Sequence, residues 1–253
     1  MLIREEVIPH GDLGFFSHPL NFGDYVVKRY QGLVPEREVD ELTNLHDSFI
    51  DDLRGIGVNI PPTDLKFISG GNGSYRIEIW QERLNPAGHA GERIKHRDRR
   101  DVLSTVHGIL EDALLFIDSP LLGKRGFHPT TRNYVFKDDV PYYVDTFPPY
   151  GSNEQTKRLM IRHAPSLLMK GVMIAGQHWL DLYTQEYYNP SEMYSGIIAS
   201  SCRLRPEYSP EIKELGRELL GNRTVAWKKE AVRIIMRTSR KPLKWRLKDW
   251  VIT

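Results

Sequence analysis

The chain has 253 residues, of which 40% are hydrophobic and 27% are charged, a composition ordinary for a globular protein. Its net charge of +2 argues against a protein that coats nucleic acid, and no apolar run is long enough to span a bilayer. The single cysteine, Cys202, excludes an internal disulfide framework and a cysteine-only metal cluster. A reducing, cytoplasmic setting is therefore expected, in a chain long enough for one large domain or two small lobes.

The first part of the chain predicts strands around one helix. Short strands are expected at Val7-Ile8, Phe15-Phe16 and Tyr25–Tyr30. The last of these is rich in β-branched and aromatic residues, which favour strands. An amphipathic helix should follow Pro35, because apolar residues recur at helical spacing until glycines end the pattern at positions 55 and 57. Two further strands fit Leu65–Ser69 and Tyr75–Trp80, joined by a glycine-rich turn.

A change in composition near residue 85 divides the chain. Residues 85–91 are rich in glycine and alanine and are interpreted as a linker, so residues 1–84 form a first lobe and residues 85–253 a second. The second lobe is predicted to be mainly helical. Its helices are expected at residues 99–118 and near 154–174, 176–187, 191–201, 209–220 and 224–238.

A hairpin is predicted within residues 126–147. Two apolar runs flank a turn at Lys137–Val140, with Asn133 just before the first strand and Asp145 at the end of the second. Such a hairpin would bring the side-chain oxygens of Asn133 and Asp145 together. This pair suits a hard divalent cation bound together with phosphate, so both residues are predicted metal ligands.

This order of elements resembles the protein-kinase-like fold, especially the branch of aminoglycoside, choline and homoserine phosphotransferases. The resemblance implies an α+β, bilobal protein: an antiparallel-sheet lobe with one helix, followed by a mainly helical lobe. It also implies that ATP or another nucleoside triphosphate binds with Mg²⁺ at Asn133 and Asp145. Lys28 stands where the family's phosphate-orienting lysine would be, with Glu41 of the next helix as its partner. Gly11 and Gly14 flank the turn that would cover the phosphates, although a full glycine-rich loop motif is absent.

Other positions complete the expected site. Residues 79–84, including Gln81 and Glu82, would form the hinge that contacts the adenine. The resemblance calls for a catalytic Asp five residues before Asn133, where this chain has His128. The imidazole of His128 titrates near neutral pH and is a candidate base for an acceptor hydroxyl. Arg132 would steady a phosphate or an acidic substrate through its forked donors.

These residues support a phosphotransferase that uses Mg-ATP to modify a small molecule, or an acceptor group carried by a peptide or carrier. The missing Asp leaves two alternatives open. One is a catalytically silent kinase-like protein that binds nucleotide or a partner. The other is an enzyme that transfers a nucleotidyl group or makes an acyl-phosphate, for which no hydroxyl-activating Asp is needed.

Structural interpretations of the same residues also exist. Lys28 could be a surface lysine, Asn133 could cap a turn, and Asp145 could cap the segment before Pro148. Zinc and serine-hydrolase chemistry are disfavoured, because the sequence has neither a His-Glu-x-x-His nor a Gly-x-Ser-x-Gly pattern.

The C-terminal segment, residues 223–253, is basic. It carries ten Lys or Arg against two acids, with three tryptophans interleaved. Such a segment could contact an anionic surface, whereas nucleic acid is not expected as a partner of the chain as a whole. Alternatively, its tryptophans dock onto the helical lobe while the basic stems cover apolar surface.

Overall fold

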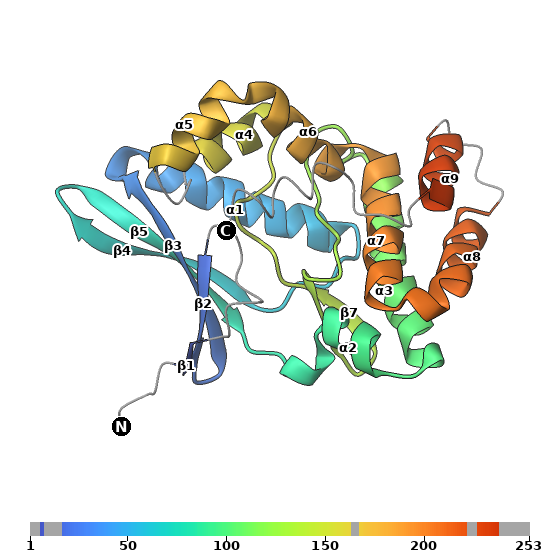
Figure 1. The fold of residues 1–253 in the computed structure, drawn as a ribbon. Helices are drawn as coiled ribbons and strands as arrows, with labels where there is room; N and C mark the ends of the chain where they lie inside the picture. Colours follow the sequence, from blue (N-terminus) through green and yellow to red (C-terminus); the bar gives the residue numbers. More distant parts are fainter. Residues whose placement is uncertain (1–5, 8–16, 163–166, 222–226, 238–253) are drawn as a thin grey trace.

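An antiparallel sheet in the order β1-β2-β3-β5-β4 forms one side of the protein (Figure 1). The computed structural model describes residues 6–7, 17–162, 167–221 and 227–237. The strand bounds are β1 Glu6–Val7, β2 Ser17–Phe22, β3 Tyr25–Pro35, β4 Thr63–Gly71 and β5 Ser74–Glu82. The β4-β5 turn has positive φ at Gly71, Asn72 and Gly73, which explains the glycine-rich sequence there.

The predicted strands β3, β4 and β5 are confirmed, but β2 is not where the sequence placed it. Phe15-Phe16 lie outside the described residues, and the observed strand begins at Ser17. Its residues have little intrinsic strand preference and include Pro19. They form a strand because they pair with β3 in continuous register, from Ser17 opposite Tyr30 to Phe22 opposite Tyr25.

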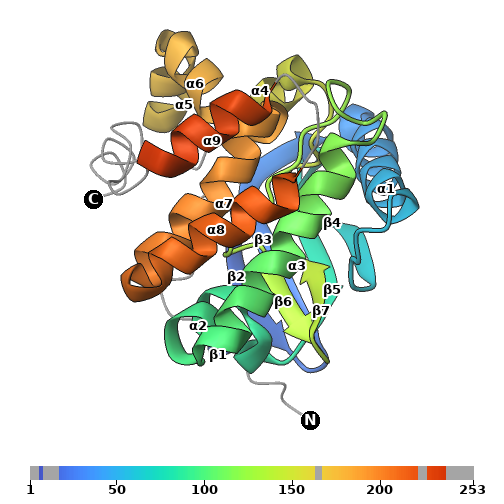
Figure 2. The same cartoon turned by 90° about the vertical axis from the view of Figure 1, so that its right-hand side faces the viewer.

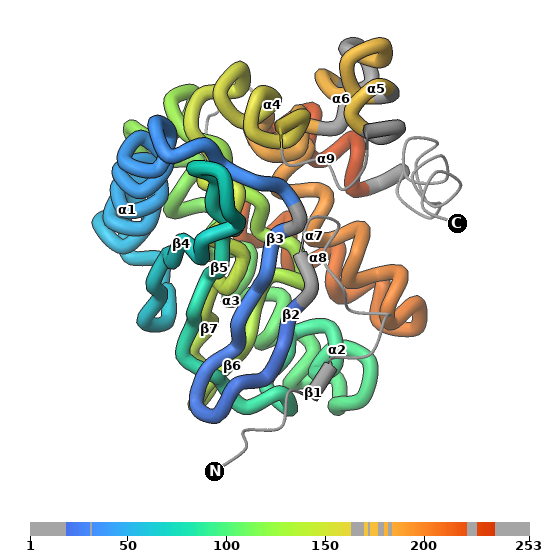
Figure 3. Tube along the Cα trace, turned by 90° about the vertical axis from the view of Figure 1, so that its left-hand side faces the viewer, coloured from blue at the N-terminus to red at the C-terminus, as the bar shows by residue number. Residues whose placement is uncertain are grey.

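The helix after Pro35 is confirmed as a short 3-10 turn, Glu36–Glu38, and the helix α1, Val39–Gly55. Its buried face touches two apolar clusters. Leu42 packs with Ile77 and Ile79 of the sheet, whereas Phe49 and Leu53 belong to the larger cluster that includes the helical side. Helix α1 therefore ties the sheet to the rest of the protein, beside β4 and β5 (Figure 3).

The second half of the chain is helical, with α7 at its centre. Helix α7 contacts α3, α6, α8 and α9 (Figure 2). The helices are α2 Ala90–His96, α3 Arg99–Ile117, α4 Asn153–Arg162, α5 Leu167–Ala175, α6 Gln177–Tyr188, α7 Pro190–Leu204, α8 Ser209–Leu220 and α9 Lys228–Arg237, with 3-10 turns at Pro86–Gly88 and Pro206–Tyr208. None of the helices in the described part of the chain is long and apolar enough to cross a bilayer.

The interpretation of residues 85–91 as a linker is wrong. Asn85 accepts a hydrogen bond from the backbone N–H of Ala87 at 3.0 Å and so caps a 3-10 turn, after which α2 begins. Gly88 serves close packing rather than flexibility. A Cβ at this position would lie 2.0 Å from the carbonyl oxygen of Phe136, so only glycine lets the turn approach the hairpin.

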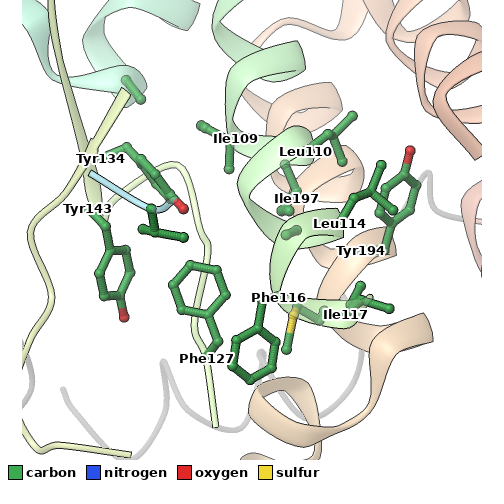
Figure 4. Packing of buried hydrophobic residues seen from close by; sticks show 14 of the residues in the cluster. Ile109, Leu110, Leu114, Phe116, Ile117, Phe127, Tyr134, Tyr143, Tyr194 and Ile197 are labelled. Carbon is green, nitrogen blue, oxygen red and sulfur yellow. The ribbon is translucent and has the colours of Figure 1, made fainter. Parts of the chain in front are cut away.

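The predicted hairpin is confirmed as β6, Tyr134–Lys137, and β7, Val140–Tyr143. Asp138 and Asp139 both have positive φ at its turn, as a tight two-residue connection requires. Phe127 packs between Phe116 of α3 and Tyr143 of β7, with ring centroids 5.1 and 4.9 Å away (Figure 4). These buried rings fix the loop before the hairpin against α3.

Part of the basic C-terminal segment is described. The backbone carbonyl of Trp227 accepts a hydrogen bond from Ser191 Oγ at 3.0 Å. The centroid of the Trp227 ring lies 5.9 Å from that of the Tyr194 ring. Trp227 therefore docks onto α7, as the structural alternative expected. Residues 238–253 lie outside the described residues, so contact with an anionic surface stays a prediction.

The order and pairing of these elements match those that the sequence implied: sheet with one helix, connection, long helix, loop, hairpin and helices. The predicted α+β fold class, with an antiparallel-sheet lobe that carries one helix and a mainly helical lobe, is confirmed. Strand β5 ends at Glu82 and the first 3-10 turn of the helical side begins at Pro86. Residues 83–85 therefore connect the sheet to the helical side, and the division of the chain at residue 84 stays a prediction.

Candidate functional site

Asn133 and Asp145 meet at the base of the hairpin. Asn133 Nδ2 donates to Asp145 Oδ2 at 3.1 Å and to the carbonyl oxygen of His128 at 2.8 Å. Both partners are acceptors, so the amide orientation is determined, because the reversed amide would put Oδ1 against two oxygens. The backbone N–H of Val144 also donates to the carbonyl of Asn133 at 2.8 Å. The hairpin therefore brings the predicted pair together.

The remaining oxygens of this pair suit a hard cation. Asp145 Oδ2 also accepts from the Tyr150 hydroxyl at 3.4 Å, whereas Asp145 Oδ1 and Asn133 Oδ1 accept no hydrogen bond from the residues that the structure describes. The same residues contain no group of three His, Cys, Asp or Glu side chains placed to hold a metal ion. Mg²⁺ commonly takes one or two protein oxygens and completes its shell with phosphate and water, so the donor set fits it.

Lys28 reaches this pair from the sheet. Its Nζ donates a short hydrogen bond to the carbonyl oxygen of Val144, the residue before Asp145. Burial lowers the pKa of Lys28 below its usual value of 10.5, and the charge of Asp145 raises it again in part. Residues 28, 133 and 145 are far apart in the sequence but form one cluster of a cation, an amide and a carboxylate.

Glu41 is not part of this cluster. Its side chain is exposed, and none of its contacts in the described structure reaches Lys28, so the expected Lys28–Glu41 pair is not formed. The reason is the phase of α1, whose buried stripe runs through Leu42 and His46 instead. Burial lowers the pKa of His46, and Asp47 opposes this shift. The buried residue His46 therefore favours its neutral form.

The hinge prediction needs correction at Gln81 and Glu82. Both belong to β5, in which Gln81 lies between Val26 and Thr63 of the neighbouring strands. The Gln81 amide donates to Thr63 Oγ1 at 3.0 Å, and the backbone N–H of Glu82 donates to the Pro62 carbonyl at 2.9 Å. These two donors are occupied within the sheet, so neither is offered to an adenine.

His128 lies beside the pair of Asn133 and Asp145, and its role as a base stays a prediction. Its Nδ1 is 3.3 Å from Asn133 Nδ2 and 3.9 Å from Asp145 Oδ2. Arg132 is exposed, and its backbone carbonyl faces His89 Nε2 at 3.2 Å. Gly11 and Gly14, the predicted phosphate-covering glycines, lie outside the described residues.

Two residues of the site were missed from the sequence. Tyr150 donates to Asp145, and Glu186 of α6 lies 3.7 Å from His128 Nε2. Glu186 is one of two acidic residues on its helix, the other being Asp181, and no motif surrounds it. Only the packing of α6 against the loop at residues 126–128 brings it to His128.

Comparison with known proteins identifies a family. A family model described as "Family of unknown function (DUF6206)" matches residues 9–251. The chain belongs to DUF6206. The DUF6206 chain has no match among curated proteins.

Among solved structures, the DUF6206 chain is similar to one titled "Structure of apo GRMZM2G135359 pseudokinase". The identity is 14%, with 91% of this chain and 90% of that chain covered and a TM-score of 0.38. The overlap is loose at this score. The fold assignment of the DUF6206 chain therefore rests on its own order and pairing of elements.

Proposed function

We propose that this DUF6206 protein is a kinase-like phosphotransferase that uses Mg²⁺ with ATP, or another nucleoside triphosphate, to modify a small molecule or a small acceptor group. One observation carries the proposal. Lys28 from the sheet meets Asn133 and Asp145 from the hairpin, and the last two each keep one side-chain oxygen without a hydrogen bond from the described residues. Phosphoryl transfer depends mainly on positioning and charge neutralisation, which this set of groups supplies.

The roles follow from the chemistry of each group. Asn133 Oδ1 and Asp145 Oδ1 would hold Mg²⁺, which supplies neutralisation of the phosphate charge when bound. Lys28 would donate to a phosphate oxygen. Burial lowers the pKa of Lys28, and the negative charge of a bound polyanion would favour its charged form. His128 would lie beside the acceptor.

The acceptor is proposed to be acidic, because Arg132 is next to Asn133 in the chain and a second guanidinium group, that of Arg203, lies close enough to interact with it. Arg132 and Arg203 are both exposed, and no described carboxylate forms an ion pair with either. The Arg203 side chain is partly covered although it reaches solvent; this desolvation, and next the positive charge of Arg132, lower the pKa of Arg203. An anionic group placed at both would remove this repulsion and could be held by paired donors.

A catalytically silent, nucleotide-binding protein is the second candidate. The observation that favours it is the occupied environment of His128, whose Nδ1 faces the Asn133 amide while Glu186 faces Nε2. A transfer of a nucleotidyl group, or formation of an acyl-phosphate, is the third candidate, because neither needs a carboxylate at position 128.

The products of nucleotide turnover distinguish these candidates. We expect the protein, incubated with Mg-ATP and a panel of small acidic acceptors, to release ADP and a phosphorylated acceptor. Release of AMP and pyrophosphate would instead establish nucleotidyl transfer. Saturable Mg-ATP binding with no turnover on any acceptor would favour the silent candidate, and absence of binding would contradict all three.

A further inference from the structure

Strand β4 forms an open edge of the sheet. It is the last strand in the order β1-β2-β3-β5-β4, and among the described strands it pairs only with β5 (Figure 1). The backbone N–H of Glu82 donates to the carbonyl of Pro62 at 2.9 Å, so this carbonyl points toward β5. Directions alternate along an antiparallel strand, and the backbone groups of Thr63, Leu65 and Phe67 therefore point toward the open edge. A row of unpaired backbone groups is a template for another strand.

The exposed side chains of this edge alternate in charge. Asp64 and Lys66 are exposed, and because they lie two residues apart they share one face of the sheet. Neither forms an ion pair with a described residue, and Lys66 Nζ lies 4.0 Å from the centroid of the Trp80 ring. Ile68 follows on the same face and is 46% exposed. The edge therefore presents one acid, one base and one large apolar side chain to a partner.

Charge complementarity selects a second copy of β4 as that partner. If two antiparallel copies are centred on Leu65, Asp64 of each copy lies opposite Lys66 of the other. Opposite charges directly across a strand pair stabilise it. In the same arrangement the exposed Ile68 of each copy lies opposite Pro62 of the other, which covers part of its apolar surface.

The backbone supports this register. Thr63 of one copy lies opposite Phe67 of the other, and Leu65 lies opposite Leu65, so the groups that β5 leaves free pair with each other. Centring on Lys66 would instead place two lysines opposite each other, which destabilises a strand pair. Centring on Phe67 would leave both charged residues without an opposite charge. The charge pattern thus favours one register over its neighbours.

Other segments of the chain fit this edge less well. Residues 1–5 and 8–16 adjoin β1 and β2 in the sequence, and these strands lie at the other end of the strand order. Residues 238–253 carry five Lys or Arg against one acid, Asp249. The edge of β4 has one acid and one base and so offers this segment no excess of negative charge.

We propose that β4 is a dimerisation edge, at which two copies of the chain pair antiparallel about a two-fold axis at Leu65 and form one continuous sheet. In such a symmetric interface every contact occurs twice, so both Asp64–Lys66 pairs form together. The pairing is independent of the proposed nucleotide site, because Lys28 lies on β3 and β5 separates that strand from β4.

Sedimentation analysis of charge-reversal variants is the test. We expect the wild type to form a dimer. Lys66→Asp alone and Asp64→Lys alone place like charges opposite each other twice, and each should raise the dimer dissociation constant at least about 10-fold. An equimolar mixture of the two variants should dimerise again, because each acid then meets a lysine. The double variant with both changes should also dimerise. Glu218→Lys, at an exposed position of α8, is the matched control and should behave as the wild type does.

A wild type that stays monomeric at every concentration would overturn the proposal. If removal of residues 238–253 then produced the dimer, that segment would be the occupant of the edge instead. A dimer that persists unchanged in both single variants would place the contact on another surface and also overturn the proposal. If the single variants fail to fold, hydrogen exchange in the wild type decides. The amides of Thr63, Leu65 and Phe67 should exchange more slowly in the dimer than in the diluted monomer, and equal rates would contradict the pairing.

Discussion

Replacing Asp112 by Asn should raise the free energy of unfolding at pH 8 by up to about 4 kcal/mol and leave it nearly unchanged near pH 4. Asp112 of α3 is 4% exposed, and its Oδ2 has no hydrogen-bond partner among the described residues. Burial raises the pKa of this carboxyl from 3.8 to about 7, and the neighbouring Tyr134 hydroxyl lowers it again in part. At about 1.4 kcal/mol for each pKa unit, holding the carboxylate charged costs the native state roughly this amount.

The sign follows from proton binding. At a pH between the pKa of Asp112 in the unfolded state and its raised pKa in the folded state, the folded state binds more protons at Asp112 than the unfolded state does. The stability that this group contributes is therefore complete below about pH 4 and is lost as the pH rises through about 7. The amide of the Asp112→Asn variant cannot ionise, so the variant lacks this loss.

Urea unfolding between pH 4 and 8 measures the effect. The difference between wild type and Asp112→Asn should grow steadily across this range. Asp51→Asn, an exposed position on α1, is the matched control and should follow the wild type. Parallel pH profiles for the wild type and Asp112→Asn would show that Asp112 keeps an ordinary pKa.

Replacing Lys28 by Met should weaken Mg-ATP binding about 10- to 100-fold. A hydrogen bond from a charged donor contributes about 1.5–3 kcal/mol, and each 1.4 kcal/mol corresponds to a factor of ten in affinity. Lys28 is suited to this role because it already lies against Val144 and the charge of Asp145. Titration calorimetry of folded protein is the measurement.

Lys66→Met is the matched control for this variant. Lys66 lies on the neighbouring part of the sheet but on the opposite face, with its Nζ 4.0 Å from the centroid of the Trp80 ring. It should keep wild-type affinity for Mg-ATP. Equal affinities for Lys28→Met and the wild type would remove Lys28 from the site.

The parts of the site that could be predicted from the sequence depend on local patterns. Alternation and an Asp-Asp turn indicated the hairpin, and this local structure is enough to bring Asn133 to Asp145. Lys28 was found because it ends an apolar strand that precedes the helix, where the kinase-like resemblance expects the phosphate-orienting lysine. These features need no knowledge of how distant helices pack.

The parts that were missed depend on tertiary contacts. Glu41 is the residue before Leu42, with which the buried face of α1 begins. Helical periodicity alone does not decide which of two adjacent residues faces inward. Gly88 looked like a linker glycine, although it allows close packing against the hairpin backbone. Glu186 reaches His128 only because α6 packs against the loop before the hairpin.

An Mg²⁺-dependent nucleotide site at Lys28, Asn133 and Asp145 is tested most directly by thermal unfolding with ATP alone and with ATP plus Mg²⁺. The wild type should be stabilised more by the second mixture, by roughly 2.7 kcal/mol in total at about 100 times Kd. Asp145→Asn should lose the metal-dependent part, whereas Asp138→Asn, at the exposed turn of the same hairpin, should keep it. A wild type that neither mixture stabilises, or an Asp145→Asn variant with the full Mg²⁺ effect, would contradict the site.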